Sequence, residues 1–250
     1  MDITLEGRTA VVTGAAKGIG ARIAVDLAAA GAAVVVNYRT DSAGADRVAK
    51  EITEAGGRAI PVRADVGRGE DVTALFTAAR DAFGTVDVLV NNAGISVFAP
   101  IEAITEEEYR RHVDTNLWST LLTTQALIGQ PGLGAASIIN VSTAGTTFHP
   151  PYAALYVATK AAVNAATLVA ATELGPRGIR VNALLPGYSD TEGTRAMGFV
   201  GSPMADQAVS GVPLGRLGTP DDYGPLAVFL SSDAARFITG AVVHVSGGRR

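Results

Sequence analysis

The chain of 250 residues contains no cysteine and is poor in charge. Without cysteine it has no disulfide framework, no zinc–thiolate site and no thiol nucleophile, and this absence is compatible with the reducing cytoplasm in which we expect the protein. Acidic and basic residues make up 18% of the chain, against roughly 25% in an ordinary soluble domain. Disordered chains show the opposite bias and are excluded as a class. The net charge of −4 disfavours a basic surface for nucleic acid, so we expect no nucleic-acid partner.

The chain also lacks a long hydrophobic run. Residues 115–159 contain no Asp, Glu, Lys or Arg, but Gln130, Pro131 and Gly132 interrupt this segment before it reaches the roughly 20 apolar residues of a membrane-spanning helix. Residues 1–6 show no positive region followed by an apolar stretch, so we expect no signal peptide. The sequence therefore predicts a buried segment at 115–159 and no membrane partner.

Short apolar runs alternate with longer segments of helical spacing along the whole chain. The runs are rich in β-branched residues without polar alternation, which is typical of strands covered by helices on both faces. This pattern predicts an α/β fold, a doubly wound parallel sheet with right-handed crossovers, in a single domain over residues 1–250. Residues 187–218, rich in Gly, Ser, Pro and Met, are expected to form a substrate-binding loop or lid. We expect strands at residues 9–13, 33–37, 59–64, 86–90, 137–141, 180–185 and 241–245, and helices that end before glycine at 19–30, 45–55 and 71–83.

A glycine-rich loop follows the first expected strand, with the sequence Thr-Gly-Ala-Ala-Lys-Gly-Ile-Gly from Thr13 to Gly20. Gly14 permits a tight turn, Gly18 lets the backbone approach a diphosphate, and Gly20 lets the helix pack closely on the strand. The free N–H groups at the start of that helix attract phosphate. Because a strand precedes the loop and a helix follows it, the sequence predicts a dinucleotide-binding loop.

The second expected strand runs into Asn37, Tyr38 and Arg39, without the acidic residue that takes the ribose 2′-hydroxyl of NAD. Lys17 in the glycine loop and Arg39 instead place two cations where a 2′-phosphate binds, and charge-assisted contacts to phosphate are strong. The sequence therefore favours NADP(H) as the cofactor, and NAD(H) stays open. The alternative is that both cations are merely solvated.

A single formal charge, that of Lys160, lies between Asp114 and Glu173. Tyr156 precedes it by four residues, so both side chains project from the same face of a helix. A nearby ammonium group favours the phenolate and lowers the pKa of tyrosine from about 10, and a decrease of about three units requires roughly 4 kcal/mol. A tyrosine whose pKa lies near neutrality can move a proton at an alcohol or carbonyl oxygen. The pair therefore predicts general acid–base chemistry.

With these motifs in this order, the chain resembles the short-chain dehydrogenase/reductase family along essentially its whole length. Residues 13–20 resemble the family's cofactor loop, and residues 91–94, Asn-Asn-Ala-Gly, its motif after the fourth strand. Asp65–Val66 resembles the pair that contacts adenine, and Pro186–Gly187 with Thr191 resembles the segment that holds the nicotinamide. The resemblance implies a Rossmann-type fold and an oxidoreductase that acts on CH–OH or C=O groups with NAD(P).

The resemblance also implies a catalytic tetrad of Asn116, Ser142, Tyr156 and Lys160. Ser142 is expected to hydrogen-bond the substrate oxygen and polarise it, and Tyr156 to transfer the proton. Lys160 is expected to lower the pKa of Tyr156 and to hold the nicotinamide ribose. Asn116 is expected to position a water that connects Lys160 with solvent. The hydride belongs to the cofactor, and the protein supplies orientation.

A cofactor site is implied that extends over the glycine loop, the end of the second strand and the segment after the sixth strand. Its members are Gly14, Lys17, Gly18, Ile19, Gly20, Asn37, Tyr38, Arg39, Asp65, Val66, Asn92, Ala93, Gly94, Tyr156, Lys160, Pro186, Gly187, Ser189 and Thr191. Two departures from the family pattern are Ser189, where Val or Ile is frequent, and Ser246, where Asp is frequent; they bear on nicotinamide clamping and terminal packing, not on the tetrad. No metal site is expected, because His149 has neither a cysteine nor a nearby acid beside it.

We expect a small carbonyl compound or secondary alcohol as the substrate, since aromatic and methionine residues predict a fairly apolar pocket. They are Phe98, Phe148, Tyr152, Tyr188, Met197, Phe199 and Met204. Two alternatives are a 3-oxoacyl-acyl-carrier-protein reductase and a glucose 1-dehydrogenase, since bacterial glucose dehydrogenases carry a stretch similar to Asn-Tyr-Arg at 37–39. Residues 117–137 offer no cation to an acidic carrier protein, which leaves Arg177 as one candidate. A non-catalytic NADP-binding regulator is the remote alternative, against which the filled tetrad counts.

Two expected helices, residues 105–128 and 154–174, are mostly without a charged face beyond Asp114. A helix that is apolar all round must be covered on both sides. The sheet covers one side, so we expect a second copy of the chain to cover the other, in a homo-oligomer (a tetramer or a dimer) with two-fold symmetry. The resemblance supports this expectation, because family members commonly pair these two helices.

Overall fold

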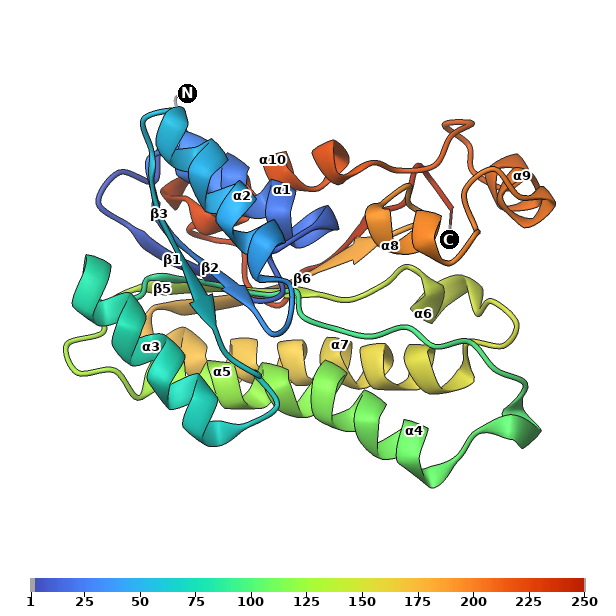
Figure 1. The fold of residues 1–250 in the computed structure, drawn as a ribbon. Coiled ribbons are helices and arrows are strands. Elements are labelled where there is room, and N and C mark those ends of the chain that lie inside the picture. The colour runs from blue at the N-terminus through green and yellow to red at the C-terminus, as the bar shows by residue number, and fades with distance from the viewer. Residues whose placement is uncertain (1–2, 250) are drawn as a thin grey trace.

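The computed structural model describes residues 3–249 and contains a seven-stranded parallel sheet between two layers of helices (Figure 1). The strand order is β3-β2-β1-β4-β5-β6-β7. The strands are β1 (Thr9–Val12), β2 (Ala33–Tyr38), β3 (Arg58–Arg63), β4 (Val88–Asn91), β5 (Ala136–Val141), β6 (Ile179–Pro186) and β7 (Val242–Val245). Each coincides with a predicted strand to within a residue or two, so the predicted α/β fold and doubly wound sheet are confirmed.

Two hydrophobic cores lie on the two faces of this sheet, because successive strand residues point to opposite sides. On β1, Val12 packs into the core shared with α1, α2 and α10, whereas Val11 packs into the core shared with α3, α5 and α7. The helices of the first face are α1 (Gly18–Ala29), α2 (Ser42–Glu54) and α10 (Gly224–Ser231). Those of the second face are α3 (Gly69–Phe83), α5 (Ser119–Ile128) and α7 (Ala154–Leu174).

Short elements join these layers. They are α4 (Glu106–His112), α6 (Gly145–Phe148), α8 (Glu192–Ala196), α9 (Pro203–Ser210), the π-helical turn η2 (Val113–Trp118) and the 3₁₀ turns η1 (Ile101–Ala103), η3 (Gly175–Arg177), η4 (Pro220–Asp222) and η5 (Asp233–Ala235). Residues 187–218, expected to be irregular, thus contain α8 and α9, whose first turns are capped by the side chains of Thr191 and Ser202. Their role as a lid stays a prediction.

The helix expected over residues 105–128 is divided into α4, the π-helical turn and α5. The wider turn lies where Asn116 faces the segment that follows β4, and its amide hydrogen-bonds both backbone groups of Ile95. Turns of this kind often mark functional positions. Hydrophobic spacing could not reveal it, because a π turn inserts a single residue into an otherwise helical pattern.

Among residues 3–249, one helix is long and apolar enough, by length and composition, to cross a membrane: α7 with its extension through Arg177, whose mean hydropathy is 1.4. Only 28% of its most apolar 18 residues are buried within the chain. The helix lies against the sheet and buries Lys160 and Thr167 there. Core helices of soluble proteins meet the same criterion, and the exposed part of α7 is an apolar surface that the chain itself does not cover.

Candidate active site

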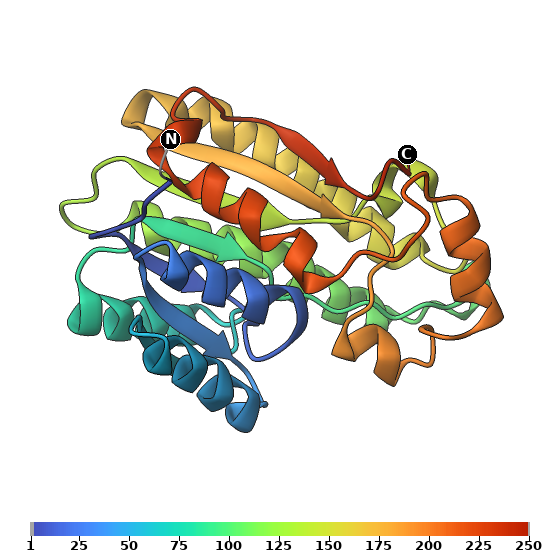
Figure 2. The same ribbon diagram turned by 90° about the horizontal axis from the view of Figure 1, so that it is seen from above.

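The candidate site lies where the carboxyl ends of β1, β4, β5 and β6 meet (Figure 2). The chain leaves β1 toward one edge of the sheet and β4 toward the other, and ligands of open α/β sheets bind at such a switch point. The segments after these two strands are joined, since the backbone N–H groups of Asn92 and Ala93 donate to the Thr13 hydroxyl at 2.9 and 3.0 Å. The predicted motifs from distant parts of the sequence therefore share one end of the sheet.

The glycine loop has the geometry that its sequence predicts. Gly14 and Gly18 adopt φ values of +61° and +59°, which favour glycine. A Cβ on Gly20 would lie 2.3 Å from the amide nitrogen of Asn92, so this position has no space for a side chain. The Asn92 amide in turn donates to the carbonyls of Thr13 and Gly14 at 2.9 and 3.0 Å. Asn92 therefore supports the loop from the side of β4.

The start of α1 is suited to an anion. The helix begins at Gly18, its N-cap Lys17 makes no side-chain capping bond, and its first turn contains no acidic residue. Ile19 is partly buried in this turn, and Lys17 is exposed beside it. Unsatisfied N–H groups and the helix dipole attract phosphate at such a terminus.

Four cationic side chains lie around the end of β2, two more than the sequence indicated. Lys17 and Arg39 are exposed, as expected. Arg47 on α2 donates to the carbonyl of Ala16 at 3.4 Å, and Arg63 at the end of β3 donates to the carbonyl of Arg39 at 3.3 Å. Arg47 and Arg63 were missed because only the register of β2 against β3 and the docking of α2 bring them to this place.

The remaining predicted residues at this end have mixed surroundings. Asn37 is buried, and its amide is engaged with backbone groups of Gly14 and of β3 and its exit, so it holds the loop in place. Tyr38 is half-buried and Val66 is buried. A carboxylate oxygen of Asp65 lies 3.8 Å from the Arg39 guanidinium. Arg39, the cation that the sequence assigned to a 2′-phosphate, is therefore paired with a carboxylate.

Asn116 and Lys160 meet on either side of Gly94. A Cβ on Gly94 would lie 3.2 Å from the Asn116 amide oxygen and 3.3 Å from the Lys160 amine, so the glycine makes room for both. Lys160 is 5% exposed, and its amine donates to the carbonyl of Val141 at 2.7 Å. Burial lowers the pKa of Lys160 to about 8.

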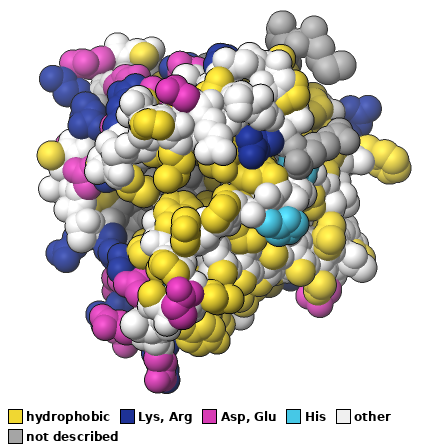
Figure 3. Space-filling view, turned by 90° about the vertical axis from the view of Figure 1, so that its right-hand side faces the viewer, with side chains coloured by type: hydrophobic (Ala, Val, Ile, Leu, Met, Phe, Trp, Pro, Cys, Tyr) yellow, Lys and Arg dark blue, Asp and Glu magenta, His cyan; other side chains and the backbone are white. Residues whose placement is uncertain are grey.

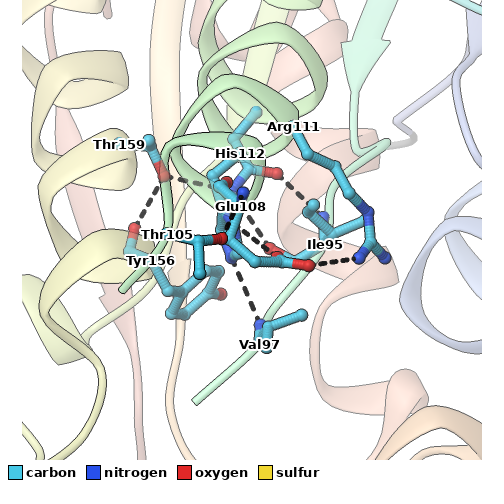
Figure 4. Close-up of polar contacts among 9 residues, drawn as sticks. Ile95, Val97, Thr105, Glu108, Arg111, His112, Tyr156 and Thr159 are labelled. Carbon is cyan, nitrogen blue, oxygen red and sulfur yellow. Dashed lines mark hydrogen bonds and ion pairs between the residues drawn. The ribbon is translucent and has the colours of Figure 1, made fainter. Parts of the chain in front are cut away.

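The Asn116 side chain is part of a network that fixes the chain after β4. Figure 4 shows two neighbouring contacts, between Thr159 and Tyr156 and between His112 and Val97. The Asn116 amide accepts from the N–H of Ile95 at 2.8 Å and donates to the carbonyl of Ile95 and to the hydroxyl of Thr159, each at 3.0 Å. Thr159 donates to the carbonyl of Tyr156 at 2.8 Å. One turn earlier, the buried His112 accepts from the N–H of Val97 at 3.3 Å. Asn116 thus connects the segment after β4 with α7.

Tyr156 faces a small group of aromatic and hydroxyl side chains. Its ring makes an edge contact with Phe98, with centroids 6.0 Å apart, and the side chain of Thr143 lies beside its hydroxyl. Burial raises the pKa of Tyr156, and the side chain of Thr143 lowers it by less. The expectation that Lys160 lowers this pKa is therefore not met by the chain alone, because desolvation of the phenol dominates.

The side chains of Ser142 and Thr143 point to different partners. Ser142 is 3% exposed, and its hydroxyl donates to the carbonyl of Lys160 at 3.1 Å. Thr143 accepts from the N–H of Gly145 at 3.1 Å, and its side chain lies beside the hydroxyl of Tyr156. Consecutive residues at a strand end project to opposite sides, so only one of the two can face Tyr156. Thr143 is the functional candidate that the sequence analysis missed.

The segment after β6 closes the site from the other side. Pro186 is buried, and a Cβ on Gly187 would lie 2.8 Å from the Cα of Ser246. The backbone at Gly187 is therefore in direct contact with the backbone near the C-terminus. The Ser189 hydroxyl donates to the carbonyl of Gly187 at 2.9 Å and bonds the hydroxyl of Tyr223. Thr191 caps α8.

Three aromatic rings that the sequence assigns to the substrate pocket pack on one another and form what we call the aromatic wall. Tyr188 packs on Phe148 and on Phe199, with centroids 5.0 and 5.6 Å apart. The Arg249 guanidinium lies 4.8 Å from the Phe148 centroid and 5.1 Å from that of Tyr188, a cation that the sequence analysis did not place here. Hydrophobic side chains gather at this end of the molecule (Figure 3); exposed ones include Val97, Phe98, Ile101, Tyr152, Met197, Met204 and Leu214.

These surroundings fit the predicted dinucleotide. The glycine loop leads into the start of α1, cations surround the end of β2, and Tyr156 and Lys160 project from α7. Within residues 3–249, no group of three or more His, Asp or Glu side chains is arranged to hold a metal ion.

The chain is similar to known proteins along nearly its whole length. Residues 14–250 match the family model described as enoyl-(acyl carrier protein) reductase. An uncharacterized oxidoreductase of Methylorubrum extorquens is 53% identical over 246 residues, which is 98% of this chain and 99% of that protein. A 3-oxoacyl-[acyl-carrier-protein] reductase of Staphylococcus epidermidis is 38% identical over 96% of this chain and 98% of its own length.

Among solved structures, a candidate NAD(P)-dependent gluconate 5-dehydrogenase from Beutenbergia cavernae, with NADP bound at low occupancy, superposes with a TM-score of 0.92. It is 38% identical, and the match covers 99% of this chain and 98% of the other. The likeness extends over the whole sheet, both helical layers and the segment with α8 and α9.

Proposed function

Because the chain belongs to the short-chain dehydrogenase/reductase family, we propose that it is a cytoplasmic, NADP(H)-dependent oxidoreductase in which Tyr156 transfers a proton to or from a carbonyl or secondary alcohol substrate. The observation that carries this proposal is the position of Tyr156 beside Thr143, on the same helix face as Lys160 and at the carboxyl ends of the strands. A hydroxyl group, a phenol and an amine together can bind an oxygen atom and move a proton at it.

The assignment of NADP(H) as the cofactor is supported by the positive charge around the end of β2 and by a related structure that contains NADP. Lys17, Arg39, Arg47 and Arg63 surround the end of β2, and the acid that selects NAD is missing there. The related structure from B. cavernae holds NADP. The start of α1 would hold the diphosphate, and Lys160 the nicotinamide ribose. When bound, the cofactor donates or accepts hydride, and the residues of this chain orient it and handle the proton.

We assign the hydroxyl that polarises the substrate oxygen to Thr143. The family resemblance implied Ser142, but the Ser142 hydroxyl is committed to the carbonyl of Lys160. Thr143 accepts from the N–H of Gly145, and its hydroxyl can turn to donate to a substrate oxygen that is held against Tyr156. In this assignment Ser142 positions α7, and Asn116 positions the segment after β4.

The substrate in this proposal is a small ketone or secondary alcohol, bound beside Phe148, Tyr188 and Phe199. A 3-oxoacyl-acyl-carrier-protein substrate, the substrate named for the S. epidermidis relative, is less favoured, because residues 117–137 carry no cation and Arg177 donates to the carbonyl of Ile128. A sugar or sugar acid is the second candidate, since Arg249 adds a cation to the aromatic wall.

We also propose a two-fold homo-oligomer through helices 105–128 and 154–174. Large apolar side chains on α5, α7 and the turn before α5 are solvent-exposed in the single chain: Trp118 is 42% exposed, Leu168 49% and Val169 56%. A second copy of these helices provides the apolar cover that the sheet provides on the other side.

A cofactor-oxidation screen tests the proposed activity. Purified protein is incubated with NADPH, and separately with NADH, in the presence of small ketones, 3-oxoacyl thioesters, keto sugar acids and sugars. We expect turnover of at least one ketone and a preference for NADPH. Tight NADPH binding without oxidation by any substrate would instead favour the non-catalytic regulator.

A further inference from the structure

A carboxylate from the segment with α8 lies on the glycine loop. Oε2 of Glu192 accepts a hydrogen bond from the backbone N–H of Gly18 at 2.9 Å, although the two residues are 174 positions apart. Thr191 reaches the same place, 3.7 Å from where a Cβ on Gly18 would be. In Figure 2 the orange α8 lies beside the blue loop that precedes α1. The start of α1 thus receives an anion from elsewhere in the chain.

The turn that carries Glu192 is well fixed. Thr191 and Thr194 form a capping box at the start of α8, and the guanidinium of Arg195 donates twice to the carboxylate of Asp190, at 2.6 and 3.1 Å. Asp190 therefore neutralises Arg195, the cation that follows Glu192 on α8. The Glu192 side chain is exposed, so it can leave its place without the removal of a packed neighbour.

A carboxylate at this N–H competes with a phosphate. The first N–H groups of a helix attract one anion as well as another, and a single N–H cannot bond both at full strength. A diphosphate brought to Gly18 would also face the negative charge of Glu192. We propose that the Glu192 carboxylate occupies the position at which the cofactor diphosphate binds, and that NADP(H) displaces it. The contact of α8 with the glycine loop then depends on whether the cofactor is bound. This inference rests on the proposed cofactor.

The consequence reaches the substrate pocket. Residues 187–218 carry both Glu192 and the aromatic side chains Tyr188 and Phe199, which pack on each other. Release of Glu192 from Gly18 therefore removes one contact that holds the segment on which these aromatic side chains lie. Glu192 is therefore a positioning residue that couples binding of the cofactor to binding of the substrate.

The test is the affinity of Glu192→Gln for the cofactor. The variant keeps the shape of the side chain but removes its charge, so we expect the dissociation constant of NADPH, measured by its fluorescence, to fall about three- to tenfold. Glu107→Gln removes an exposed charge at the start of α4 and should leave this constant unchanged. Adenosine 2′-phosphate has no diphosphate, and its dissociation constant should be the same in the variant and the wild type.

Two results would overturn the inference. One is an NADPH dissociation constant that is unchanged or higher in Glu192→Gln. The other is an equal change for NADPH and adenosine 2′-phosphate, which would mean a general rearrangement of the site. Failure of the wild type to bind NADPH at all would be a different outcome, because it would contradict the proposed function itself.

Discussion

Lys160 and Tyr156 are ionisable side chains held in places where their charged forms are unfavourable. Burial lowers the pKa of Lys160 to about 8 and raises the pKa of Tyr156. Neither has a carboxylate partner among the described ion pairs. Their surroundings therefore keep a proton-transfer group and an amine in a nearly charge-free part of the fold, at a cost in stability that depends on pH.

The amine of Lys160 should make the stability of the cofactor-free protein rise with pH. Between about 8 and 10.5 the unfolded chain keeps the proton on this amine while the folded chain has lost it, so the free energy of unfolding increases with pH. Relative to Lys160→Met, the wild type should gain up to about 3 kcal/mol over this range. Urea unfolding of both proteins at several pH values measures this, and parallel pH dependences would contradict it.

Thr143 and Ser142 make a matched pair for testing which hydroxyl acts on the substrate. Loss of one preorganised donor costs about 10²- to 10³-fold in kcat, and we expect this loss in Thr143→Val but not in Thr143→Ser. Ser142→Ala should lower the free energy of unfolding by about 1 kcal/mol with kcat nearly retained. The opposite pattern, a slow Ser142→Ala and an active Thr143→Val, would return the role to Ser142.

At the scale of elements, the strands and the glycine loop were predictable because their signals are local. β-branched runs bounded by glycine define the strands, and the Thr13–Gly20 sequence defines a strand–turn–helix. The π turn at Asn116, the docking of Arg47 beside Ala16, and the contact between Glu192 and Gly18 were not predictable. Each depends on where distant segments meet, which periodicity and spacing do not encode.

The close packing of the glycine loop on the exit of β4 predicts the effect of a single methyl group. Gly20→Ala places a Cβ 2.3 Å from the amide nitrogen of Asn92 and 2.7 Å from the carbonyl oxygen of Gly14, so the loop must shift. We expect the dissociation constant of NADPH to rise at least about tenfold. Gly69→Ala is the control, because nothing lies within 4 Å of its Cβ position and helical alanine is favoured. Equal affinities of the two variants would contradict this account of the loop.

In the whole molecule, the shortage of charged residues is concentrated in one part of the fold. The segment without acidic or basic groups forms β5, α5 and the start of α7, and the outer faces of these helices expose apolar side chains. Composition alone could show the shortage but not this distribution, because which helix face meets the sheet is decided by the packing of β4, β5 and β6. The same distribution explains why α7 has the length and apolarity of a membrane-spanning helix.

Light scattering at micromolar concentration should therefore give the mass of a dimer or tetramer. Leu168→Glu and Val169→Glu place a charge on the exposed apolar face of α7 and should shift the mass toward that of a monomer, since burying an unpaired charge is costly. Met204→Glu, on the equally exposed α9, should leave the mass unchanged. A monomeric wild type would refute the proposed oligomer.

The central claim is that Tyr156 carries the proton in a hydride-transfer reaction, and the variant Tyr156→Phe tests it most directly. The substitution removes the hydroxyl beside Thr143 and leaves the ring that packs on Phe98. With a substrate found in the screen, we predict that kcat falls at least about 10²-fold while the dissociation constant of NADPH stays within about twofold of wild type. A variant that keeps more than about a tenth of the wild-type kcat would contradict the account, because loss of a proton-transfer group costs far more.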